Sequence, residues 1–116
     1  MKTFEYKDQW GDVTRVRLVR GAYADGSLAV QMLREGDRYW EPYATLTVNL
    51  RDARSQNASY AYVDTNNMPA APEFLVENGL ASFTGACGTG GFCTYPLFAF
   101  TGELFAACAD GNGEVR

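Results

Sequence analysis

Apolar and polar residues alternate with a period of two through the first half of the chain. Four successive runs place their apolar residues at Phe4 and Tyr6, at Val16 and Leu18, at Leu28, Val30 and Met32, and at Ala44, Leu46, Val48 and Leu50. Short segments containing Gly and Asp separate the runs and suit tight reversals of the chain. The pattern therefore predicts an antiparallel meander of four strands with one buried face, which needs a cover.

The second half of the chain is expected to supply that cover. Tyr60–Val63 is predicted as a fifth strand. A single short helix follows, for which Asn67 is the expected N-cap. Pro69 and Pro72 fall in its first turn, where the missing N–H groups cost little. Gly79 is expected to end the helix in the left-handed conformation, with Leu80 packing back on the helix.

The last third of the chain is rich in glycine and aromatic residues. The segment 85–92 contains four glycines and predicts a turning loop. Residues 93–100 and 102–108 predict a closing hairpin, and residues 110–116 a frayed polar tail. The fold class is thus α+β, an antiparallel β-meander of four to six strands with one short helix packed on the apolar face. A chain of 116 residues fits one domain spanning 1–116.

Charge divides the chain into two unequal halves. The formal net charge is −4, yet residues 1–54 hold nine of the ten basic side chains and carry a net +1. Residues 55–116 carry a net −5, which repels phosphate groups. The chain starts with closely spaced charges and has no run of eighteen apolar residues, and its cysteine count is odd. These features predict a soluble protein of the cytoplasm without a membrane partner.

The residue types present exclude several chemistries. Without histidine, the common Ser-His-Asp and Cys-His nucleophile arrangements cannot form. The cysteine spacing does not suit zinc, and the glycine-rich segment lacks the Lys-Ser/Thr ending of a phosphate-binding loop. We therefore expect no catalytic residue, no metal and no cofactor. A cysteine-dependent enzyme using Cys87 or Cys93 is an alternative, although buried, inert thiols explain the cysteines better.

Arginine residues in the first half of the chain suggest a second alternative function, the binding of nucleic acid. The six residues concerned are Arg15, Arg17, Arg20, Arg34, Arg51 and Arg54. Clustered arginines bind phosphates, so this arginine face is compatible with a nucleic-acid-binding accessory protein of plasmid maintenance. Acidic residues on neighbouring strands, including Glu5 and Glu35, explain the same arginines as partners in cross-strand ion pairs. We favour the ion-pair interpretation.

Four segments together resemble a known family. They are Glu41–Leu50, Val63–Asn67, Phe74–Ala81 and Gly91–Leu97, in this order along the chain. The resemblance is to an uncharacterised family of small bacterial, phage and mobile-element proteins, with no family-wide catalytic residue. It implies a context in which small acidic proteins bind and inhibit host defence proteins, such as CRISPR effectors and restriction enzymes.

The leading hypothesis is therefore a non-enzymatic protein that binds a protein partner through an acidic surface. Charge steers association and aromatic side chains supply contact energy. The candidate partner-binding residues are Asp64, Glu73, Glu77, Glu103 and Tyr95. Glu73 and Glu77 stand one helical turn apart and so share one face of the predicted helix.

Overall fold

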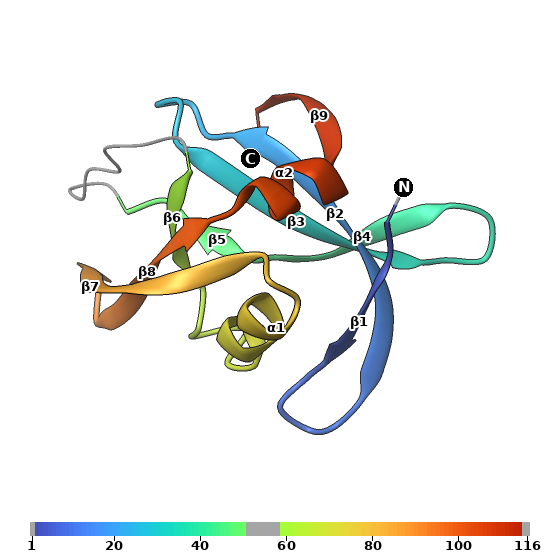
Figure 1. The fold of residues 1–116 in the computed structure, drawn as a ribbon, viewed down its shortest axis with the longest axis horizontal. Helices are drawn as coiled ribbons and strands as arrows, with labels where there is room; N and C mark the ends of the chain where they lie inside the picture. Colours follow the sequence, from blue (N-terminus) through green and yellow to red (C-terminus); the bar gives the residue numbers. More distant parts are fainter. Residues whose placement is uncertain (1, 51–58, 115–116) are drawn as a thin grey trace.

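Two β-sheets and two short helices make up the described part of the chain (Figure 1). The structure is a computed structural model and describes residues 2–50 and 59–114. Its first sheet has the strand order β1-β2-β3-β4, with β9 also pairing with β2, and its second sheet has the order β5-β6-β8-β7. The α+β class predicted from the sequence is confirmed.

The predicted meander forms the first sheet. Its strands are β1 (Phe4–Lys7), β2 (Val13–Ala22), β3 (Leu28–Glu35) and β4 (Trp40–Thr45). Each strand pairs antiparallel with the next, and Leu18 lies opposite Met32. The apolar residues expected on the covered face, from Phe4 and Tyr6 to Met32, are all buried. The period of two in the sequence thus identified both the strands and their inner face.

The chain passes from one sheet to the other at Leu46. The Leu46 N–H donates to the Val30 carbonyl at 2.9 Å, and the Leu46 carbonyl accepts from the Asp64 N–H at 2.8 Å. Residues after this point form β5 (Thr47–Val48), which pairs with β6 (Tyr60–Val63). The fourth apolar run is therefore split, and Val48 does not continue β4 as the alternation predicted. The predicted polar loop at 51–58 lies outside the described residues.

The predicted helix is α1 (Ala71–Glu77), but it is capped differently from the prediction. Its N-cap position is Ala70, without a side-chain hydrogen bond. Asn67 instead joins a turn, where its side chain donates to an Asp64 carboxylate oxygen at 2.8 Å. Asn67 lies three residues before the N-cap position, so the prediction that it caps α1 was wrong.

The end of α1 matches the prediction. Gly79 has a φ of 68°, a left-handed conformation that favours glycine. The Leu80 N–H donates to the Leu75 carbonyl at 2.9 Å, and both side chains are buried in the core. This pairing is the Schellman arrangement with its hydrophobic contact.

The glycine-rich segment is a strand and not the expected loop. It forms most of β7 (Ala81–Gly90), which pairs antiparallel with β8 (Cys93–Phe100). A Cβ atom at Gly88 would lie 2.7 Å from Tyr62 Cε1 and 2.8 Å from Leu50 Cδ1. Glycine is therefore required here because the side chains of Leu50 and Tyr62 rest directly on the backbone of β7.

The closing hairpin predicted from residues 93–100 and 102–108 is wrong in its second half, because residues 93–100 form β8 but residues 102–108 form no strand. Gly102–Ala107 forms a second helix, α2, and Ala109–Glu114 forms strand β9, which runs parallel to β2. The Thr101 hydroxyl donates to the Gly79 carbonyl at 2.9 Å and so ties the start of α2 to the end of α1. The expected tail at 110–116 is thus largely strand, and residues 115–116 lie outside the described residues.

One hydrophobic core joins both sheets and both helices. It includes Val16, Leu18 and Met32 from the meander, Val63 and Phe98 from the second sheet, and Phe74 and Leu104 from the helices. Phe74 packs edge-on against Phe4 and Tyr6, with ring centroids 5.9 Å and 5.3 Å apart. The helix therefore packs on the apolar face of the meander, as predicted.

Candidate functional site

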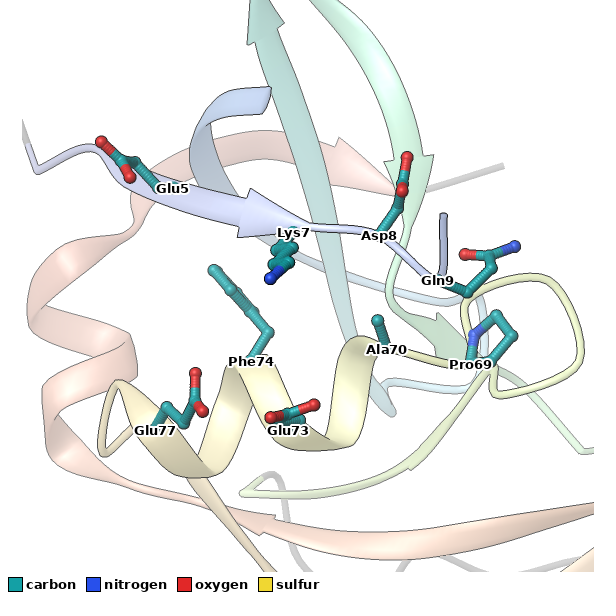
Figure 2. Close-up of a pocket in the computed structure, with 9 residues that line it drawn as sticks. All are labelled: Glu5, Lys7, Asp8, Gln9, Pro69, Ala70, Glu73, Phe74 and Glu77. Atoms are coloured by element: carbon teal, nitrogen blue, oxygen red, sulfur yellow. The ribbon is translucent and has the colours of Figure 1, made fainter. Parts of the chain in front are cut away.

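A groove lies between β1 and α1 and has a volume of about 620 Å³ (Figure 2). One wall comes from β1 and the turn after it, and the other from α1 and the residues before it. The lining residues are Glu5, Lys7, Asp8, Gln9, Pro69, Ala70, Glu73, Phe74 and Glu77. We call this feature the acidic groove. Its volume is in the range of binding sites for ligands.

The β1 wall follows from the alternation in the sequence. Phe4 and Tyr6 point into the core, so Glu5 between them and Lys7 after Tyr6 are exposed. Asp8 stands at the end of the strand, and its carboxylate accepts hydrogen bonds from the backbone N–H groups of Trp10 and Asp12 at 2.9 and 3.0 Å. Asp8 thus stabilises the β1–β2 turn and adds its negative charge to one end of the groove.

The α1 wall presents two carboxylates and one ring. Glu73 and Glu77 are exposed and project from the open side of the helix, whereas Phe74 points toward β1 (Figure 2). Because Phe74 is buried against Phe4 and Tyr6, it holds the helix and the strand together beneath the groove. The groove therefore has an apolar floor and charged walls.

Negative charge dominates the groove. Four of the nine lining residues are acidic and one, Lys7, is basic, which gives the lining a formal charge of −3. Over residues 2–50 and 59–114, Lys7 forms no ion pair with these carboxylates. Glu73 and Glu77 stand four residues apart on a helix, where like charges destabilise the folded state. Such an arrangement favours a cationic ligand.

The structure brings together two of the five residues predicted for the site. Glu73 and Glu77 line the groove, as their helical spacing suggested. Glu103 stands in the first turn of α2 and Asp64 in the turn after β6, and neither lines the groove. Tyr95 lies on β8, where a hydrogen bond to the Cys93 thiol raises the pKa of its phenol, and the charge of Asp64 acts in the same direction. Partner binding by Asp64, Glu103 and Tyr95 therefore stays a prediction that is separate from the groove.

Sequence reasoning missed the β1 side of the groove. Glu5, Lys7 and Asp8 are separated from α1 by more than sixty residues along the chain. The alternation indicated that Glu5 and Lys7 point away from the core, but no local pattern indicates which element stands opposite them.

The arginine face is largely engaged in contacts within the chain. Arg34 Nε pairs with Glu41 Oε1 at 2.8 Å, across the β3–β4 ladder. The Arg17 and Arg20 guanidinium groups lie over the rings of Trp40 and Phe105, 5.1 and 5.2 Å from the ring centroids. Arg51 and Arg54 lie outside the described residues. These contacts give three of the six arginines partners within the chain, and phosphate binding by this face stays an alternative.

The thiols of Cys87 and Cys93 are placed in paired strands. Cys87 is exposed and lies opposite Pro96, and Cys93 is half-buried and lies opposite Gly90, so the expectation that these thiols are buried was wrong. The glycine loop that was expected to surround them with backbone N–H groups is absent, because those residues form β7. Within the described part of the chain, no three Cys, Asp or Glu side chains are grouped to hold a metal ion. Neither described helix has the length and apolarity needed to cross a membrane.

Comparison with known proteins identifies the family. The model of a domain of unknown function, DUF4313, matches residues 18–115. The chain therefore belongs to this family. The matched residues include α1 but begin within β2, so β1 lies before them. Searches of the curated proteins and of the solved structures found no match.

Proposed function

We propose that this chain is a non-enzymatic protein-binding module whose acidic groove holds a basic segment of a partner protein. The observation that carries the proposal is the clustering of Glu5, Asp8, Glu73 and Glu77 around one concave surface with only Lys7 to offset them. Charges that repel one another in the free protein gain favourable interactions when a cationic partner binds. Trp10, two residues after the groove-lining Asp8, adds an exposed aromatic ring, 78% accessible, in the β1–β2 turn.

We further propose that the partner is a DNA-binding protein of a host defence system, such as a CRISPR effector or a restriction enzyme. Proteins that bind DNA carry basic surfaces that neutralise phosphates, and an acidic groove is complementary to such a surface. In this proposal the protein is encoded by a phage or another mobile element and acts in the cytoplasm. It would inhibit its target by occupying the surface that DNA uses.

Charge reversal in the groove tests the proposal. The immobilised chain would first capture partners from a host lysate, and mass spectrometry would identify them. We expect Glu73→Lys combined with Glu77→Lys to weaken binding of a captured partner by about tenfold or more, because desolvated charge pairs contribute a few kcal/mol. The same variant should reduce protection of a phage in a plaque assay.

A second double variant controls for net charge. Glu35→Lys combined with Asp37→Lys changes the charge equally, at exposed positions that do not line the groove. This control should bind and protect like the unmodified chain. Equal binding by both double variants would contradict the assignment of the groove. A captured partner that binds equally well in the presence of excess DNA would contradict inhibition at the DNA-binding surface.

A further inference from the structure

The strand that lines the acidic groove has an open edge. Among residues 2–50 and 59–114, β1 is the terminal strand of its sheet and pairs only with β2. In Figure 1, β2 lies on one side of β1 and α1 on the other. The edge of β1 that is not paired with β2 therefore borders the groove.

The register of the β1–β2 ladder shows which backbone groups are on that edge. The Asp8 N–H donates to the Asp12 carbonyl at 2.9 Å, so these two residues form a hydrogen-bonded pair. In an antiparallel ladder such pairs alternate, which makes Tyr6–Thr14 and Phe4–Val16 the next hydrogen-bonded pairs. The N–H and C=O groups of Glu5 and Lys7 consequently point away from β2.

The opposite wall is suited to hold an added strand in place. Phe74 forms an apolar floor, while Glu73 and Glu77 stand along the helix facing the exposed side of the groove. Recognition of an extended peptide commonly uses this combination, in which a sheet edge supplies backbone hydrogen bonds and neighbouring side chains supply specificity. The outer edge of β7 is less suitable, because a bulge between Phe83 and Cys87 interrupts its register.

We infer that the partner contributes an extended, lysine- or arginine-rich segment that adds as a strand to the β1 edge. Its backbone pairs with the N–H and C=O groups of Glu5 and Lys7, and its basic side chains approach Glu73 and Glu77. This inference rests on the proposed function and deepens it, since it specifies the conformation of the bound segment. It predicts that recognition depends on backbone hydrogen bonds as well as on charge.

Peptides with selectively blocked amides test the strand pairing. The probe is a six-residue peptide of alternating lysine and valine, blocked at both ends, and the readout is its affinity by calorimetry. In an added strand only every second amide faces β1. N-methylation of one alternating set should therefore reduce affinity by about tenfold or more, while methylation of the other set should leave it nearly unchanged.

Substitutions at Lys7 test the same point from the protein side. Lys7→Pro removes the outward N–H without removing a bond to β2, and proline is tolerated at such edge positions. Lys7→Gln is the matched control, because it removes the same charge and keeps the N–H. We expect Lys7→Gln to bind the peptide at least as well as the unmodified chain and Lys7→Pro about tenfold more weakly.

The outcomes separate this inference from the proposed function. Equal affinity of both methylated peptides, or no binding of the unmethylated one, would overturn strand addition. Partner capture that is still lost on charge reversal of Glu73 and Glu77 would leave the proposed function in place. A dimer of the unliganded chain that Lys7→Pro dissociates would show that a second copy occupies the edge, which would also overturn the inference. If Lys7→Pro fails to fold in a thermal unfolding control, the methylated peptides decide alone.

Discussion

At the scale of single residues, Tyr6 shows how the groove is built over the core. Only 2% of its surface is accessible, and its hydroxyl has no hydrogen-bond partner among the described residues. Burial, together with the neighbouring Tyr43 and Asp8, raises the pKa of its phenol to about 12. A buried hydroxyl without a partner lowers stability, because it loses its hydrogen bonds to water on folding.

Tyr6→Phe should therefore stabilise the protein by about 1 kcal/mol at neutral pH. It should also weaken the alkaline pH dependence. The unfolded state releases the Tyr6 proton near pH 10, whereas the folded state retains it to about pH 12. The free energy of unfolding that depends on this proton is therefore fully present below pH 10 and is lost as the pH rises toward 12. Urea unfolding at pH 8 and at pH 11 would measure both effects. A less stable Tyr6→Phe variant at pH 8 would show that the hydroxyl has a partner.

At the scale of elements, the order of the charges along α1 does not favour the stability of the helix. Glu73 lies in the first turn, where a negative charge is favourable, but Glu77 is the last helical residue and the last turn contains no basic residue. The same two carboxylates belong to residues four apart, which share one face of the helix and repel each other. The helix would be more stable with a cation at position 77, yet it would then place a positive charge in the acidic groove.

Glu77→Lys should accordingly change stability and binding in opposite directions. We expect the folded state to gain about 0.5–1 kcal/mol, from the helix dipole and from a new pair with Glu73. Affinity for the lysine-valine peptide should fall at the same time. Thermal unfolding and calorimetry on one preparation would measure the two quantities, with Glu77→Gln as an intermediate control. A variant that is both more stable and equally able to bind would remove Glu77 from the site.

At the scale of the whole molecule, the two halves of the chain depend on one core. The covered face of the meander, with Val16, Leu18 and Met32, meets side chains from both helices and from the second sheet. Phe74 from α1 and Leu104 from α2 are both buried in this cluster. The first fifty residues therefore contain the four strands of the meander and β5 but lack the residues that cover the meander.

Residues 1–50 expressed alone should not unfold cooperatively. Without Phe74, Leu75 and Leu104, the apolar face of the meander is exposed to water, and a sheet with one uncovered apolar face lacks the burial that stabilises folded domains. Differential scanning calorimetry and the dispersion of amide resonances would test this, with the full chain as the reference. A sharp unfolding transition of the fragment would show that the meander is stable by itself.

The sequence alone predicted the α1 side of the acidic groove but not its β1 side. The spacing of Glu73 and Glu77 places both on one helix face from the sequence alone, because a helix has a fixed period. Glu5 and Lys7 were foreseeable as exposed residues of a strand. Their position opposite α1 was not, because it depends on how Phe74 packs against Phe4 and Tyr6.

What the sequence determined by itself is local. The alternation from Phe4 to Met32 specifies strands with one buried face, and Gly79 with Leu80 specifies where α1 ends, because these signals act over a few residues. Only the tertiary structure decided that the chain changes sheets at Leu46 and that a glycine-rich segment becomes β7. Both depend on contacts between distant residues, such as Leu46 with Val30 and Leu50 with Gly88. The groove is also decided by the tertiary structure, because only the shared core brings its two walls together.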